Sequence, residues 1–336
     1  MRITGIGING DANHLNGSLS QLEKDMAFFH YCGFDTVELS VHGLDVVING
    51  RLQQRQVDKV HAITKRFDFV YTVHAPNRLN LAFPQSWPGH PPALAHEQDV
   101  FVACLDFCAA IGARVMVYHS GLIALQQAAF GLAALPDDEA LEQAREQEVS
   151  ALRELMPLAA ERGVVVVMEN RDPHLWEVAT LMRASLSPDQ LLKYHAGMVI
   201  PNLVRQIEAV NHSNLGLTLD FAHLFLAANH CGFDYLEAIQ QAAPYVRHLH
   251  GNDNFGRLGG AFDSLPEHIP YGDGDLHLPP GWGVIPHAEA LAQLPAYEGR
   301  YILELHPRFY EHFPEALETM RRIIREVSNE LIYATR

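Results

Sequence analysis

The sequence has few cysteines and no long apolar run. Its four cysteines show no metal or redox spacing, so we expect buried, reduced thiols at Cys32, Cys104, Cys108 and Cys231. No stretch of about 18 apolar residues could form a membrane span. The first ten residues are typical of a buried strand rather than of a signal region. We therefore expect a cytoplasmic protein that does not contact membranes.

Positive charge is also scarce. Lysine and arginine number 24 against 40 aspartates and glutamates, which gives a formal net charge of −16. A polyanion would be repelled unless a local basic patch overrode this charge, and no run of Lys and Arg provides one. We therefore do not expect nucleic acid as a partner. Apolar residues make up 48% of the chain and charged residues 19%, as in a globular protein with a sizeable core.

Short β-branched runs alternate along the chain with longer stretches of helical period. This alternation is typical of βα units around a parallel sheet that is buried on both faces. Eight runs predict strands: Arg2–Ile8, Thr36–Ser40, Phe69–Val73, Arg114–Tyr118, Val164–Met168, Leu215–Leu219, Val246–Leu249 and Tyr301–Leu303. Amphipathic segments predict helices that include Ser18–His30, Asp137–Arg162 and Pro314–Asn329.

These elements predict an α/β fold, a (β/α)₈ TIM barrel formed by residues 1–336 as a single domain. An open, doubly wound sheet is the alternative, but the glycine-rich opening segment lacks the spacing of a dinucleotide fingerprint. Two long connections rich in Pro and Gly follow strands, Asn77–Pro92 and Gly251–Pro286. In a barrel, such βα loops cover the active face.

Histidine is abundant, with 20 copies, and its placement predicts a metal site. Six successive strands are each followed by a potential ligand: His74, His119, Glu169, Asp220, His250 and Glu304. The ends of barrel strands converge on one axis, so these side chains should lie close together. Any one histidine is more often a structural, hydrogen-bonded residue. Imidazoles combined with carboxylates favour Zn²⁺, Mn²⁺ or Fe²⁺ over Ca²⁺ or Mg²⁺.

Other residues near the strand ends add weaker evidence. His223 follows Asp220, and Asp275 with His277 lies in the second long loop, although Asp-x-His alone is usually a turn with a surface histidine. Arg171 could pair with a substrate anion or with an acidic ligand. Trp176 and Trp282 could stack on a sugar ring or only pack in a loop.

As a set, these motifs resemble those of the xylose isomerase-like TIM barrels, which include sugar isomerases, sugar epimerases and the endonuclease IV repair enzymes. The resemblance spans nearly the whole chain. It is carried by the strand-end motifs His74-Ala-Pro, His119-Ser-Gly, Glu169-Asn, Asp220 with His223, His250 with Asp253, Asp275-x-His277 before Gly281-x-Gly283, and Glu304.

The resemblance implies two ligand sets. Similarity to the epimerase-like branch implies one metal held by Glu169, Asp220, His250 and Glu304. Similarity to endonuclease IV implies three metals. The first would be held by His74, His119 and Glu169; the second by Glu169, Asp220, His250 and Glu304; and the third by His223, Asp275 and His277. We therefore expect one to three ions of Zn²⁺ or Mn²⁺, or of Fe²⁺.

We expect a sugar isomerase or epimerase that transfers a proton through a metal-stabilised enediolate. Glu169 and Glu304 would be the acid/base pair, because carboxylates in different environments can divide these roles. The substrate would be a small carbohydrate-like molecule bound by His74, His119, Arg171 and Trp282. A three-metal phosphodiesterase, a dehydratase and a barrel that only binds its ligand are the alternatives. The resemblance also allows a homo-oligomer.

Overall fold

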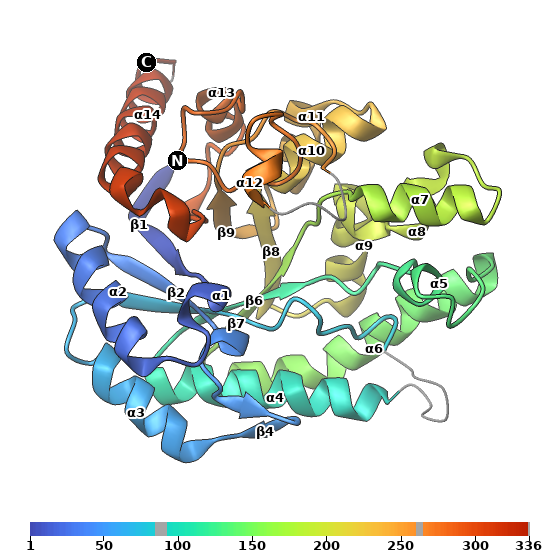
Figure 1. Cartoon of the computed structure of the whole chain (residues 1–336), viewed down its shortest axis with the longest axis horizontal. Coiled ribbons are helices and arrows are strands. Elements are labelled where there is room, and N and C mark those ends of the chain that lie inside the picture. The colour runs from blue at the N-terminus through green and yellow to red at the C-terminus, as the bar shows by residue number, and fades with distance from the viewer. Residues whose placement is uncertain (85–92, 260–264, 335–336) are drawn as a thin grey trace.

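Eight parallel strands form a closed barrel in a computed structural model that describes residues 1–84, 93–259 and 265–334 (Figure 1). Neighbouring strands follow the order β1, β10, β9, β8, β7, β6, β5, β2 before the barrel closes on β1. The strands are β1 Arg2–Gly10, β2 Thr36–Ser40, β5 Val70–His74, β6 Val115–His119, β7 Val165–Glu169, β8 Leu215–Asp220, β9 Val246–Gly251 and β10 Glu298–Leu303. The predicted (β/α)₈ barrel is confirmed.

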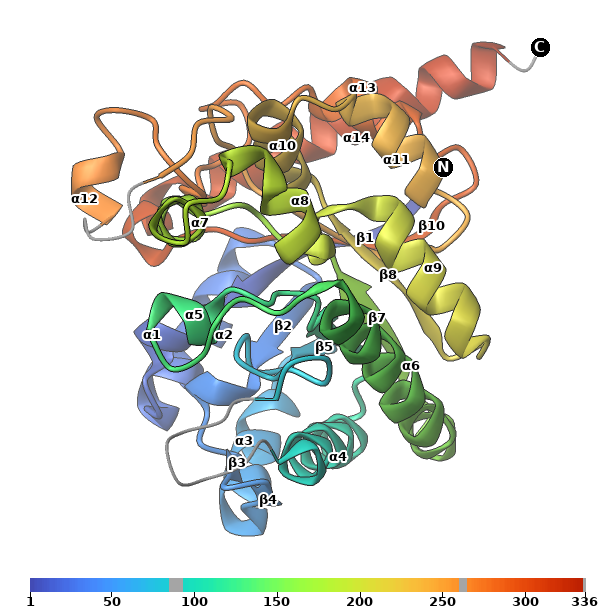
Figure 2. The same ribbon diagram turned by 90° about the vertical axis from the view of Figure 1, so that its right-hand side faces the viewer.

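Helices surround the barrel, as the two perpendicular views show (Figures 1 and 2). They are α1 Ala12–Leu15, α2 Leu19–Cys32, α3 Gln54–Thr64, α4 Leu94–Ile111, α5 Gln126–Ala129, α6 Asp138–Glu161, α7 Leu175–Arg183, α8 Leu191–Tyr194, α9 Ile200–Val210, α10 Phe221–Cys231, α11 Tyr235–Ala242, α12 Leu265–His268, α13 His287–Ala292 and α14 Phe313–Ala334. Short 3₁₀ turns are Val41–Gly43, Pro188–Gln190, Ala196–Met198 and Pro307–His312. A small antiparallel ribbon, β3 Val47–Ile48 with β4 Arg51–Leu52, was not predicted.

Local chemistry explains where a typical helix begins and ends. The Ser18 side chain caps α2 by accepting the backbone N–H of Gln21, and Gly33 ends the helix with φ +90°. Leu22, Met26 and Phe29 recur at helical spacing and are buried against the barrel. The helix predicted at Ser18–His30 is therefore confirmed, with ends that differ by one or two residues.

The predicted strands all exist, but β10 begins three residues earlier than expected. Its first residues, Glu298 and Gly299, pair with Arg2 and Ile3 of β1. These residues do not form an apolar run. They pair through backbone hydrogen bonds where the first and last strands close the barrel, and such bonds do not require apolar side chains. Apolar patterning therefore identified only the buried half of this strand.

Both long βα loops reach the open end of the barrel. Asn77 from the first loop and Asp275 from the second line the same cavity. Residues 85–92 of the first loop and 260–264 of the second lie outside the described residues. The predicted position of these loops over the active face is confirmed for the described parts.

The four cysteines are unpaired. Cys104 and Cys108 are buried in α4, as predicted, whereas Cys32 and Cys231 are only half-buried. Within the described ranges, none of the helices has the length and apolar character that crossing a membrane requires.

Asp253 fixes the second long loop to the barrel. Its buried carboxylate accepts backbone N–H bonds from Asn254, Gly281 and Ile285, at 3.0, 2.8 and 3.1 Å. Gly283 packs directly on this turn. A Cβ there would meet the carbonyl oxygen of Asn254 more closely than real Cβ atoms approach backbone.

Gly283→Ala should therefore destabilise the protein, by about 1–3 kcal/mol for overpacking. Gly197→Ala is the matched control, because the nearest atom to its Cβ would be 3.6 Å away. Thermal melting followed by circular dichroism measures both variants. Equal melting temperatures would contradict the tight packing of this loop.

Candidate active site

The six predicted strand-end residues converge at one end of the barrel. Ligand atoms of Glu169, Asp220, His250 and Glu304 all lie within 4.8 Å of one another, and so do those of His74, His119 and Glu169. All six side chains are buried, with no more than 8% of any residue exposed. Barrel closure has therefore assembled, from six strands, the cluster that the sequence predicted.

The two ring nitrogens of His250 have different partners. Nδ1 lies 2.9 Å from Glu169 Oε1 and 3.4 Å from Glu304 Oε1, whereas Nε2 lies 2.9 Å from Glu38 Oε1. Burial opposes a charge on this ring, but the charges of Glu38, Glu304 and Glu169 raise the pKa of His250 well above its usual value. Nδ1 of His250 is the nitrogen that faces the cluster.

Glu38 is a residue of the site that the sequence analysis missed. It lies within β2, is 1% exposed, and also contacts His248 Nε2 at 3.0 Å and Thr72 Oγ1 at 2.8 Å. Burial would raise the pKa of Glu38, but His250 and His248 hold it well below its usual range. The signal for Glu38 in the sequence is an acid inside a buried β-branched run, whereas the predicted site rests on strand ends alone.

Glu169 lies at the centre of the cluster. Its Oε2 is 3.2 Å from His74 Nε2 and 2.8 Å from His119 Nε2. Burial opposes ionisation of Glu169, but His250 and His119 keep its pKa well below the usual value. Glu169 is therefore a buried anion in contact with three imidazoles, those of His74, His119 and His250.

Asp220 shows why the cluster suits a cation. Burial raises its pKa to about 7, and the nearby charges of Glu304 and Glu169 act in the same direction. Its Oδ2 is buried and has no hydrogen-bond donor among the described residues. Three crowded carboxylates and one imidazole nitrogen form a donor set that fits a divalent transition metal.

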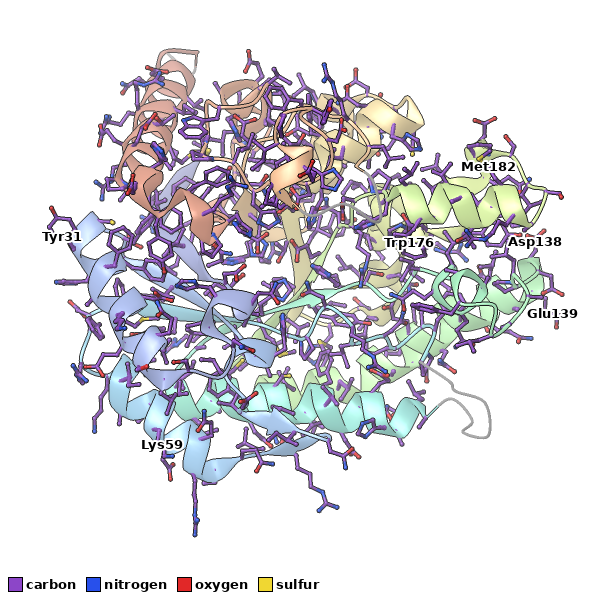
Figure 3. The ribbon with its side chains drawn as sticks, in the orientation of Figure 1. Tyr31, Lys59, Asp138, Glu139, Trp176 and Met182 are labelled. Carbon is purple, nitrogen blue, oxygen red and sulfur yellow. The ribbon has the colours of Figure 1, made fainter. Side chains whose placement is uncertain are left out.

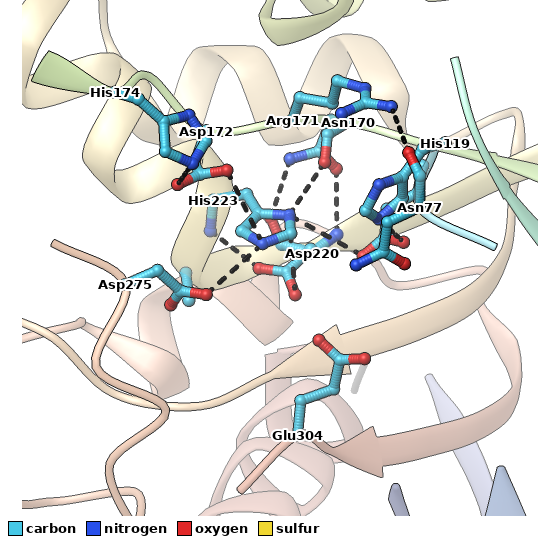
Figure 4. A network of polar contacts seen from close by, with 12 residues as sticks. Asn77, His119, Asn170, Arg171, Asp172, His174, Asp220, His223, Asp275 and Glu304 are labelled. Carbon is cyan, nitrogen blue, oxygen red and sulfur yellow. Dashed lines mark hydrogen bonds and ion pairs between the residues drawn. The ribbon is translucent and has the colours of Figure 1, made fainter. Parts of the chain in front are cut away.

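His223, Asp275 and His277 form a looser group beside this cluster, and Figure 4 shows His223 and Asp275. Nδ1 of His223 donates to the carbonyl oxygen of Asn170 at 3.0 Å, while Nε2 lies 3.5 Å from Asp275 Oδ2. His277 Nε2 lies 2.5 Å from the same oxygen. Within the described ranges, these three side chains do not converge as the two tighter groups do.

A cavity of about 750 Å³ opens above the cluster. His74, His119, Arg171 and Glu304 line it, whereas Glu169, Asp220 and His250 lie beneath its floor with no exposed surface. Arg171 donates from Nε to Ser120 O at 2.9 Å and from Nη2 to Asn77 O at 3.2 Å, so it joins the loops after β6 and β5 (Figure 4).

The two tryptophans differ in position. Trp282, predicted to bind substrate, is not among the described residues that line the cavity. Its ring packs on Phe309 and His312, with centroids 5.7 and 4.6 Å apart. Trp176 does line the cavity, and it lies in α7 rather than in a loop. We therefore do not retain Trp282 as a substrate-binding residue.

A second polar network, also missed from sequence, lies along the cavity wall. His174 Nε2 is 3.6 Å from Asp172 Oδ2, and Glu177 accepts the His174 backbone N–H at 2.8 Å. Asp172 raises the pKa of His174 to about 9, against the effect of burial, and Glu177 acts in the same direction as Asp172. His174 is therefore protonated at neutral pH.

Asp172→Asn should lower the pKa of His174 toward the ordinary value near 6.5, because it removes the largest cause of the increase. Because the pKa of His174 is raised in the folded state, the contact between His174 and Asp172 stabilises the protein fully below about pH 6.5. This stabilisation is lost as the pH rises through about 9. NMR titration of the imidazole signals measures the change, with the signal assigned by its loss in His174→Gln. An unchanged pKa in Asp172→Asn would contradict this explanation.

Comparison with solved structures shows the same fold in sugar-processing proteins. A D-tagatose 3-epimerase-like protein has a TM-score of 0.68 and 17% identity, and the match covers 98% of this chain and 100% of that chain. An L-ribulose 3-epimerase has a TM-score of 0.65 and 14% identity over 100% of this chain and 99% of that chain. A 3-keto-D-glucoside 4-epimerase from E. coli has a TM-score of 0.62 and 16% identity, and the match covers 95% of this chain and 99% of that chain.

Sequence comparison alone gives a family but no individual relative. No curated protein sequence matches this chain significantly. The family profile described as xylose isomerase-like TIM barrel matches residues 27–327, which is most of the chain. The strand-end motifs, the closed barrel and this match agree, and the chain belongs to the xylose isomerase-like TIM barrel family.

Proposed function

We propose that this protein is a divalent-metal-dependent sugar isomerase or epimerase. The observation that carries the proposal is the buried group of Glu169, Asp220, His250 and Glu304 at the floor of the cavity. Three carboxylates so close together need a positive partner. Asp220 Oδ2 accepts no hydrogen bond from the described residues, and His223 Nδ1 lies 3.9 Å from it. The epimerases with the same fold support a keto sugar as the substrate class.

These four residues would hold the metal. When bound, a divalent cation acts as a Lewis acid that makes a C–H next to a carbonyl more acidic. Mn²⁺, Zn²⁺ and Fe²⁺ all suit a set of three carboxylates and one imidazole. His250 would bind through Nδ1, because Glu38 occupies its Nε2 side.

Glu169 and Glu304 have different environments, as an acid/base pair requires. Glu169 is fully buried among imidazoles, whereas Glu304 lines the cavity and reaches its open space. One of these carboxylates would remove the proton next to the carbonyl of the substrate. The other carboxylate, at a different position in the site, would return a proton to the substrate. His74 and His119, which line the cavity beside them, would orient substrate hydroxyl groups, and Arg171 would hold the wall on which His119 lies.

Metal-assisted phosphodiester hydrolysis is the second candidate. The close group of His74, His119 and Glu169 favours it, because this group could hold another ion. The cavity itself does not favour a polyanion. Its described lining contains Arg78 and Arg171 but five carboxylates, namely Asp11, Asp172, Asp273, Asp275 and Glu304.

Adding Mn²⁺ or Zn²⁺ to metal-stripped protein should raise the free energy of unfolding, by about 2.7 kcal/mol at a concentration one hundred times Kd. Asp220→Asn should remove most of this effect. Asp273→Asn, which changes an acid of the same cavity outside the metal cluster, should keep it. Calorimetric titration and thermal melting measure binding, and equal binding by the Asp220 variant would contradict the assignment.

When ketoses are incubated with the protein in deuterated water, the proton next to the carbonyl should exchange for deuterium. NMR measures the rate of this exchange. Glu169→Gln and Glu304→Gln should each reduce the exchange rate by about 10²–10⁴-fold, because each removes a proton-transfer group. Glu315→Gln, which changes an exposed acid hydrogen-bonded by Trp282, is the control and should retain the rate. Cleavage of an abasic DNA duplex without exchange on any sugar would favour the hydrolase instead.

A further inference from the structure

We propose that the cavity contains a second subsite at the first turn of α7, and that this subsite binds a second sugar ring. The substrate would then be a keto sugar joined to another sugar, rather than a free hexose. This inference rests on the proposed function, because it assumes that the keto sugar is held at the metal cluster. Trp176 and His174 would form the subsite.

The size of the cavity is the first argument. Its volume of about 750 Å³ lies in the upper part of the range of about 300–1,000 Å³ that holds drug-sized ligands. A free hexose is smaller than such ligands. The cavity extends from Glu304 and His74 on the barrel to Trp176 on α7 and Leu265 on α12, so a hexose at the metal cluster would leave much of it unfilled.

A chain of side-chain contacts leads outward from the cluster to α7. His223 Nδ1 lies 3.7 Å from Glu169 Oε1, and His223 Nε2 lies 4.0 Å from Asp172 Oδ1. Asp172 Oδ2 in turn lies 3.6 Å from His174 Nε2, and the rings of His174 and Trp176 are 6.1 Å apart. Figure 4 shows His174 beyond Asp172, on the far side from His119. Three side chains therefore separate Trp176 from Glu169.

The chemistry of this wall matches a sugar ring. Sugars combine an apolar C–H face with hydroxyl groups around the edge. The Trp176 indole offers an apolar aromatic face, and the neighbouring His174 is half-exposed and offers N–H donors. Asp172 and Asp273 also line the cavity and supply acceptors for hydroxyl groups.

The first turn of α7 is held rigidly, as a binding surface requires. Glu177 is fully buried, accepts the His174 backbone N–H at 2.8 Å, and lies 2.8 Å from Nδ1 of the equally buried His195. The Trp176 carbonyl oxygen accepts a bond from Thr180 Oγ1 at 2.7 Å. Figure 3 shows Trp176 at the end of α7 nearest the barrel and Met182 at the far end. The buried Glu177 side chain, which bonds to the His174 backbone and packs on His195, thus fixes the residues that face the cavity.

The test compares D-fructose with lactulose, in which a fructose unit carries a galactose ring. Exchange of the proton next to the carbonyl in deuterated water gives kcat and KM for each sugar. We expect a higher kcat/KM for lactulose. Trp176→Ala should raise KM for lactulose about five- to ten-fold while leaving kcat, and both constants for D-fructose, nearly unchanged. Trp176→Phe should restore most of the affinity.

Trp282→Ala is the matched control, because its ring packs outside the described lining of the cavity. It should leave both sugars unaffected. If D-fructose is preferred, or if Trp176→Ala affects both sugars equally, the second subsite is refuted and the proposed function stands. If neither sugar exchanges but another ketose does, the second subsite is refuted and the proposed function stands, whereas absence of exchange with every ketose refutes both proposals. Thermal melting of each variant separates loss of binding from loss of folding.

Discussion

The mutual repulsion of buried carboxylates is the constraint on which this site depends. Glu169, Asp220 and Glu304 come from three different strands, yet their oxygens lie within 4.8 Å of one another. The barrel strands fix the backbone positions, so the acids cannot separate without opening the sheet. His250 relieves part of the repulsion through Nδ1, and Glu38 and His248 hold that ring from behind. Burial raises the pKa of Asp220 to about 7, and the charges of Glu304 and Glu169 act in the same direction.

The sequence predicted the barrel and the six residues at its centre, because both follow from a simple repeating rule. Each strand is an apolar run, and the residue at its end points toward a common axis. The rule failed where a residue inside a strand, rather than at its end, contributes its side chain to the site. Glu38 occupies such a position, and only the register of β2 with β5, which pairs Glu38 with Thr72, brings it toward the site.

The residues of the cavity wall were harder to predict, because loops and short helices have no such rule. Trp176 and Trp282 offer similar evidence in the sequence, since each lies in a segment that follows a strand, β7 or β9. The structure separates them, because α7 returns to the barrel opening while Trp282 packs against the 3₁₀ turn at Pro307–His312. Tertiary packing, which local sequence does not specify, decides which of them faces the cavity.

The closing of the barrel by β1 and β10 also affects when the site can form in the cell. Ribosomes release the chain from the N-terminus, and β10 with Glu304 belongs to its last part. Until that strand has left the ribosome, β1 and β9 lack a neighbour and the cluster lacks one of its acids. A nascent chain therefore lacks the full set of four donors that the proposed function assigns to the metal. In that proposal, the ion would bind after translation, in competition with the other free ions of the surrounding compartment.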